Sequence, residues 1–166
     1  MQAKFTNWLQ TQARQGCDIW QYQETVSKRL AAWAALNMFL GVWFQQRRNK
    51  TLRGVGMQSI SWGAINALIA IFGNTAATIR RNGKDDPFAA EVVQKEHRNL
   101  LLALWINAGL DVLYIIGGGA LIVTRGSKDR LARGNGWGII IQGTFLFVFD
   151  VIHALIMSNN TKETQS

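Results

Sequence analysis

The sequence predicts an all-α protein, a four-transmembrane-helix bundle preceded by a short N-terminal interfacial helix. Three observations support this fold class. Four apolar runs are separated by very polar connectors, the runs are apolar around most of the helix circumference, and Lys and Arg lie beside the runs. A soluble four-helix bundle is the alternative, but each of its helices would show a polar face. We therefore expect residues 1–166 to form a single integral membrane domain.

Residues 1–29 are expected to form a polar or amphipathic N-terminal segment. Phe5, Trp8 and Leu9 have the spacing of one stripe on a short helix. Such a helix would lie at the membrane interface, with Trp8 and Trp20 as anchors. The alternatives are a helix packed on the end of the bundle and a partly disordered tail.

The four helices are predicted over about residues 30–46, 55–79, 87–124 and 136–157. Crossing a hydrocarbon layer of roughly 30 Å takes about 20 residues, which the last two runs provide. The first run is short, and the second is long enough only when its weakly polar end is included. Asp86-Pro87 is typical of an N-cap followed by proline in the first turn, which predicts the start of the third helix.

The charge pattern argues against nucleic acid as a partner. The net charge is +8, yet the cations do not gather on one polar face. The connectors 45–56 and 124–135 are basic, so the positive-inside rule places them in the cytoplasm and both termini outside. The cations of the central loop favour the opposite orientation, which leaves the orientation open. Cys17 is the single cysteine, which excludes an internal disulfide.

Polar side chains near the middle of the predicted helices form the candidate site. Asp111 and Asp150 have about the same depth when both are counted at 1.5 Å per residue from the connector between their helices. An ionised carboxylate in hydrocarbon costs several kcal/mol, so both should face the interior. We expect a polar layer, for ligand binding or for structure alone, made of Asn37, Asn66, Asn107, Asp111, Tyr114, Gln142, Asp150 and His153.

His153 lies one helical turn from Asp150 and is expected to be a hydrogen-bond partner of that carboxylate. Two neighbouring carboxyl groups would rarely both ionise, so one would hold a proton or both would share a cation. The alternative is that the layer only joins the helices through hydrogen bonds, each worth about 1 kcal/mol.

No catalytic residue, metal site or cofactor is predicted. The sequence contains no nucleophile elbow, phosphate loop, CxxC or HExxH motif. A bis-histidine haem would need two facing histidines, but Glu96 and His97 are expected in a solvated extension of the third helix. A metal site made of Asp111, Asp150 and His153 would lack soft ligands. The sequence therefore leans against an enzyme and leaves the question open.

Three stretches resemble a known family: WGAINALIA (62–70), NAGLDVLYIIGG (107–118) and GNGWGIIIQGTFLFVFDVIHAL (134–155). The family consists of small uncharacterised bacterial membrane proteins, grouped as a domain of unknown function. The likeness covers about residues 30–157. It implies a four-helix protein of the bacterial inner (cytoplasmic) membrane and supplies no activity, cofactor or catalytic residue.

Two functions are compatible with these features. The first is a multi-pass membrane protein whose polar layer binds or moves a small ion, a proton or a polar ligand. The second is an accessory or scaffolding membrane protein whose polar layer is purely structural. The lipid bilayer is the expected partner in both cases. A second copy of the chain or a membrane partner protein remains an open alternative.

Overall fold

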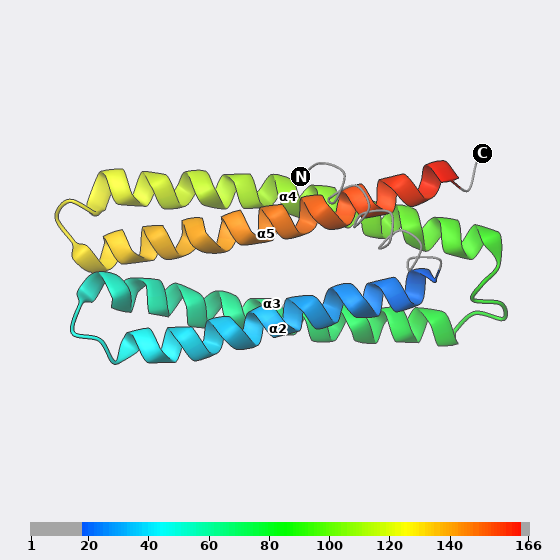
Figure 1. The fold of residues 1–166 in the computed structure, drawn as a ribbon, viewed down its shortest axis with the longest axis horizontal. Helices are drawn as coiled ribbons and strands as arrows, with labels where there is room; N and C mark the ends of the chain where they lie inside the picture. The colour runs from blue at the N-terminus through cyan, green and yellow to red at the C-terminus, as the bar shows by residue number, and fades with distance from the viewer. Residues whose placement is uncertain (1–17, 164–166) are drawn as a thin grey trace, which may run out of the picture.

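The computed structural model describes residues 18–163, with side chains up to Asn159. The described chain forms four helices, α2 (Ile19–Gln45), α3 (Lys50–Asn82), α4 (Ala90–Arg125) and α5 (Arg130–Glu163). Two antiparallel hairpins, α2 with α3 and α4 with α5, lie side by side (Figure 1) and meet mainly through α3 and α5. The predicted all-helical bundle is confirmed. The predicted interfacial helix around Trp8 lies outside the described residues.

The first helix begins at residue 19 rather than at about residue 30, because a side chain caps it. The Asp18 carboxylate accepts a hydrogen bond from the backbone N–H of Trp20 at 2.9 Å. Asn49 caps α3 in the same way, accepting from the backbone N–H of Thr51 at 2.9 Å. Such caps typically stabilise a helix by about 1 kcal/mol. The polar segment before the first apolar run is therefore helical from Ile19 onward.

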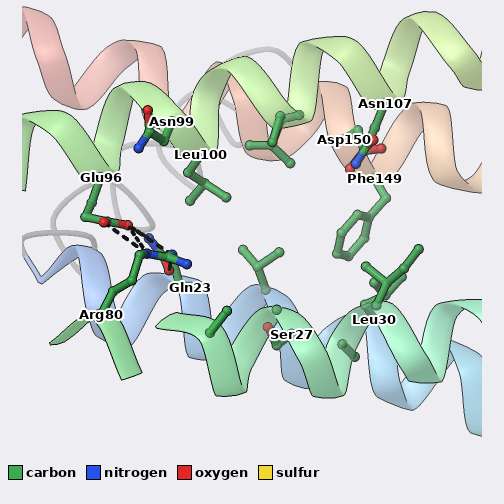
Figure 2. A pocket seen from close by; sticks show the side chains of 17 residues that line it. Gln23, Ser27, Leu30, Arg80, Glu96, Asn99, Leu100, Asn107, Phe149 and Asp150 are labelled. Carbon is green, nitrogen blue, oxygen red and sulfur yellow. Dashed lines mark hydrogen bonds and ion pairs between the residues drawn. The ribbon is translucent and has the colours of Figure 1, made fainter. Parts of the chain in front are cut away.

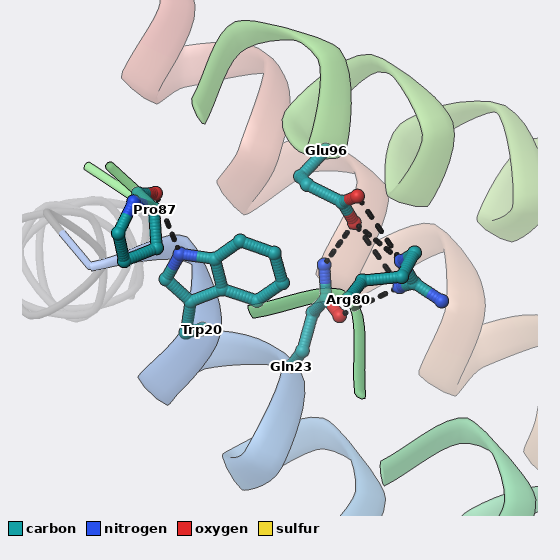
Figure 3. A network of polar contacts seen from close by, with 5 residues as sticks. All are labelled: Trp20, Gln23, Arg80, Pro87 and Glu96. Atoms are coloured by element: carbon teal, nitrogen blue, oxygen red, sulfur yellow. Dashed lines mark hydrogen bonds and ion pairs between the residues drawn. The ribbon is translucent and has the colours of Figure 1, made fainter. Parts of the chain in front are cut away.

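Trp20 does not anchor the chain at a membrane interface, because it is packed inside one end of the bundle. Its side chain is 4% exposed and contributes to a core cluster with Ile19, Leu104 and Met157. Its indole N–H donates to the backbone carbonyl of Pro87 at 3.0 Å (Figure 3). Both the apolar body and the polar tip of the indole are thus satisfied within the protein.

The start of α4 also differs from the prediction. Asp86 and Pro87 form a turn rather than a helix cap, and α4 begins at Ala90. The Asp86 carboxylate accepts from the backbone N–H of Phe88 at 2.9 Å, and the Pro87 carbonyl accepts from the indole of Trp20. These bonds hold the backbone in the loop for three further residues.

Glycines bring the helices into backbone contact at the end of the bundle that holds the α2–α3 and α4–α5 turns. A Cβ atom on Gly118 would lie 2.8 Å from the carbonyl oxygen of Gly136, and one on Gly134 would clash with the carbonyl oxygen of Thr51. Any side chain at these positions would force the helices apart. Because α5 begins at Arg130 rather than at residue 136, Gly134 and Gly136 lie inside the helix.

Three helices are long and apolar enough to cross a membrane: α3, α4, and α5 as far as Asn159. Many of their large apolar side chains point away from the bundle, such as Phe72 (66% exposed) and Ile116 (61% exposed). Exposing so much apolar surface to water would be unfavourable, whereas contact with lipid chains is favourable. The structure therefore supports a membrane protein with three candidate spans.

Candidate functional site

Two acidic side chains meet inside the bundle. Asp111 of α4 is 3% exposed and Asp150 of α5 is 6% exposed. Their carboxyl groups lie within hydrogen-bonding reach of each other. Gly143 allows this approach, since a Cβ there would lie 3.1 Å from the carbonyl oxygen of Asp111. We refer to Asp111 and Asp150 as the carboxyl pair.

Two buried side-chain atoms in the described part of the chain have no hydrogen-bond partner. One is Oδ2 of Asp111, an acceptor in the carboxyl pair. The other is Nδ2 of Asn66, a donor whose residue is 1% exposed. Leaving a buried polar group unsatisfied costs about 1–3 kcal/mol. Both atoms belong to the predicted polar layer, so this part of the layer is not fully hydrogen-bonded within the protein.

A second part of the layer is completely hydrogen-bonded and joins α2 to α5. The side-chain amide of Gln142 donates to Oδ1 of Asn37 through a short hydrogen bond and accepts from the indole N–H of Trp33 at 3.2 Å. Nδ2 of Asn37 donates to the backbone carbonyl of Trp33 at 2.9 Å. The side chains of Gln142 and Asn37 are both buried. Such closed sets of hydrogen bonds are typical of contacts between membrane helices.

Two residues of the predicted layer are not buried. Tyr114 is 41% exposed and packs edge-on against Trp62, with 4.8 Å between ring centroids. Asn107 is also exposed. The reason is that α4 turns a narrow face into the bundle, with Ala108 and Asp111 at its centre, and the other two residues flank that face. The prediction that both are buried is therefore wrong, although Asn107 still lines a cleft that reaches Asp150.

His153 is buried, but it does not pair with Asp150 as predicted. Its Nδ1 donates to the backbone carbonyl of Phe149 at 2.7 Å. Its Nε2 lies 3.3 Å from Nη1 of Arg29 on α2. A guanidinium only donates and a carbonyl only accepts, so these contacts assign a neutral ring with its proton on Nδ1. The imidazole thus links α2 to α5, one turn away from the carboxyl pair.

A cleft of about 410 Å³ runs from one end of the bundle to Asp150. We call it the α3–α4 cleft, because α3 and α4 form its two sides in Figure 2. Small residues on both sides, among them Gly73, Ala76 and Ala103, leave the space open. The apolar part of the lining also includes larger side chains: Val26, Leu30, Ile69, Leu100, Leu104 and Phe149.

The outer end of the cleft holds a network of three side chains, Gln23, Arg80 and Glu96, which we call the bundle-end network. Nε of Arg80 lies 3.0 Å from Oε1 of Glu96, and its Nη2 lies 3.1 Å from Oε2 (Figure 3). The amide of Gln23 donates to Glu96 at 3.3 Å and accepts from Arg80 at 3.3 Å. The network therefore joins α2, α3 and α4.

Glu96 was expected in a solvated turn, but it is buried, with only 4% of its surface exposed. The sequence does contain a signal for this position. At 100° per residue, Glu96, Ala103 and Asn107 lie within about 40° of one another on α4. Glu96 therefore shares a helix face with two other residues of the cleft, one of which belongs to the predicted layer.

The histidines make backbone hydrogen bonds, and no metal centre is evident in residues 18–159. Nε2 of His97 donates to the carbonyl of Met157 at 2.9 Å. Within the described chain, no three His, Cys, Asp or Glu side chains are grouped so as to hold a metal ion. The hydroxyl of Tyr22 donates to the backbone carbonyl of His153 at 3.4 Å.

One comparison with known proteins gives a match. The family model described as Family of unknown function (DUF6992) matches residues 29–151. No curated protein and no solved structure matches the chain. The matched region runs from α2 into α5 and contains every residue of the predicted layer except His153. The expected resemblance to a family of unknown function is thereby confirmed.

Proposed function

Because the chain belongs to the DUF6992 family, whose function is unknown, we propose a function from the site itself: a multi-pass membrane protein that binds a proton at the carboxyl pair. The observation that carries the proposal is the burial of Asp111 and Asp150 within hydrogen-bonding reach of each other. Two adjacent buried carboxylates repel strongly, so one proton held between them is favourable. The proposal is also supported by Oδ2 of Asp111, a buried acceptor that has no hydrogen-bond partner within the described chain.

A proton suits the site better than a larger ion does. The oxygen-bearing side chains at the centre are Asp111, Asp150 and Asn107, which offer five side-chain oxygens in all, and Leu104, Leu146 and Phe149 are apolar side chains on the same two helices. A calcium ion takes six to eight oxygen ligands, and magnesium takes six. A proton needs only one oxygen from each carboxyl group.

The proposal includes four spans in the inner membrane of a bacterium, with α2 as the fourth. α2 packs along α3 in the same bundle, and its 27 residues extend for about 40 Å. Its outward side chains include Phe39 (70% exposed) and Val42 (54% exposed), which are suited to lipid. The resemblance of residues 107–118 and 134–155 to small bacterial membrane proteins supports the bacterial inner membrane as the location in this proposal.

Labelling with a hydrophobic carbodiimide tests the proposal, because this reagent reacts with protonated carboxyl groups in apolar surroundings. The protein is reconstituted in liposomes, treated at a series of pH values and mapped by mass spectrometry. Asp150, which lines the cleft, is expected to be labelled in acidic buffer and to lose labelling as the pH rises. Asp111→Asn should change the pH at which labelling is lost, because the two groups titrate together.

The matched control is Asp85→Asn, which removes an exposed carboxyl group in the α3–α4 loop and should leave the labelling of Asp150 unchanged. Two results contradict the proposal. One is an Asp150 that resists the reagent at every pH. The other is a labelling profile that is identical with and without Asp111.

The alternative function is an accessory or scaffolding protein whose polar layer only holds the helices together. The closed hydrogen-bond set of Gln142, Asn37 and Trp33 favours it, since this part of the layer has no unused polar atom for a ligand. Exposed Trp105 (47%) and Trp137 (49%) would then contact a membrane partner. Co-purification of one defined partner, with no effect of Asp150→Asn in cells, would favour this alternative.

A further inference from the structure

We propose that the α3–α4 cleft is an aqueous route by which protons reach the carboxyl pair, and that water enters this route from the α3–α4 loop side of the membrane alone. The inference rests on the proposed function and adds to it the route and the side. It follows from a difference between the two halves of the bundle. The half between Asp150 and the α3–α4 loop contains the cleft, whereas the helices of the other half are closely packed.

The open half leads from the bundle-end network to Asp150. Arg80 and Glu96 lie at the outer end of the cleft, and Asn107 and Asp150 lie at its inner end (Figure 2). The eleven residue steps from Glu96 to Asn107 correspond to about 16 Å along α4. Asp111 does not line the cleft, so Asp150 is the member of the pair that the cleft reaches.

The cleft has room for water, and polar side chains line part of its length. Taking about 30 Å³ per water molecule, its volume of about 410 Å³ accommodates on the order of ten waters. Ser27 and Asn99 also line it, and Asn107 adjoins Asp150 at the inner end (Figure 2). Arg80 is half exposed at the outer end, with a side-chain exposure of 45%. A proton from bulk water can therefore pass along hydrogen-bonded waters to a carboxylate oxygen of Asp150.

The other half of the bundle is closed by direct contact between helices. Between the two hairpins, a Cβ on Gly54 of α3 would lie 2.7 Å from the backbone nitrogen of Asn135 on α5, and one on Gly138 of α5 would lie 2.5 Å from Cβ of Gln58 on α3. Gln142 crosses the interior between these contacts and the carboxyl pair, with its amide hydrogen-bonded to α2. Backbones this close leave no width for water, so protons reach the pair from the α3–α4 loop side alone.

Cysteine accessibility tests the route without depending on the titration of the pair. In a Cys17→Ser background, Ala103→Cys and Ala76→Cys place a thiol on each side of the cleft. Gly117→Cys is the matched control, because this position on α4 is exposed and a Cβ there has no other atom within 4 Å. The probe is a charged, membrane-impermeant methanethiosulfonate. It is applied to vesicles in which the α3–α4 loop faces outward and to vesicles in which this loop faces inward.

Both cleft cysteines should react more than about tenfold faster than Gly117→Cys, because the reactive thiolate forms in water and not in lipid. The reaction should occur only when the reagent is on the α3–α4 loop side. The inference is overturned if the cleft cysteines are as unreactive as Gly117→Cys, the result expected when a lipid chain fills the cleft. It is also overturned if they react from the opposite side.

The two proposals fail in distinguishable ways. Reactive cleft cysteines combined with an Asp150 that never titrates overturn the proton site and its use of the route, but they confirm an aqueous cleft. Unreactive cleft cysteines combined with an Asp150 that titrates overturn the route and leave the proton site standing.

Discussion

Gln142 stabilises the bundle through hydrogen bonds that no apolar side chain can replace. It donates to Asn37 and accepts from the indole of Trp33. Gln142→Leu keeps a similar volume but leaves a buried acceptor and a buried donor unsatisfied. We expect a loss of about 1–2 kcal/mol in unfolding free energy, measured by denaturation in mixed micelles. Ile141→Leu, at a neighbouring position that is 47% exposed, should change stability little, and an equal loss there would contradict this account.

Arg80 compensates the charge of a buried carboxylate. Glu96 has a side-chain exposure of 6%, and Arg80, its partner in the ion pair, is half exposed. Arg80→Leu leaves that carboxylate unpaired, and we expect a loss of up to about 3 kcal/mol in unfolding free energy. Glu96→Gln in the same chain should restore most of the loss, because no buried charge then remains. Additive losses in the double variant would show that the two side chains are not coupled.

From the sequence, the burial of Asp111 and Asp150 can be predicted more reliably than the hydrogen-bond partners of the polar residues. Asp111 and Asp150 lie in apolar runs, so the high cost of exposing a carboxylate to lipid indicates an interior position. The choice between Asp150 and Arg29 as the partner of His153 depends on how α2 is aligned with α5, which the sequence pattern does not contain. Glu96 was missed because it lies outside the apolar run of α4, where solvent exposure is the usual expectation.

On α4, one glycine is required for helix packing and its neighbour is not. Gly118→Leu would place a side chain against the backbone of Gly136 and separate α4 from α5, whereas a side chain on Gly117 meets no other atom within 4 Å. We expect Gly118→Leu to lower the thermal stability in detergent strongly and Gly117→Leu to leave it equal or slightly higher, because leucine favours helix more than glycine. Equal effects of the two substitutions would contradict the packing of these helices.

The helix ends show where prediction from the sequence fails. Apolar runs give the existence of four helices, but capping side chains and turns set their limits. Asp18 starts α2 well before its apolar run, and the Trp20–Pro87 hydrogen bond delays the start of α4. Both effects depend on contacts between distant parts of the chain or on a cap within a polar stretch. An apolar pattern contains neither.

The bundle as a whole has two distinct ends, and its membrane topology can be measured. If α2 to α5 all cross the bilayer, the α2–α3 turn lies on one side, and the α3–α4 loop and the start of α2 lie on the other (Figure 1). In a Cys17→Ser background we expect Arg48→Cys to react from one side, and Gln21→Cys and Asp85→Cys from the other. All three positions are exposed. Labelling of Gln21→Cys from the same side as Arg48→Cys would show that α2 does not span.

The most direct test of the account is infrared spectroscopy of the protein in lipid bilayers, which detects the C=O stretching band of a protonated carboxyl group. We predict such a band in the wild-type protein, shifted by exchange into heavy water and lost as the pH is raised. It should be absent from the variant carrying both Asp111→Asn and Asp150→Asn, whose amide bands should still report a helical bundle. A wild-type protein without this band, or a double variant that retains it, would contradict a proton held by the carboxyl pair.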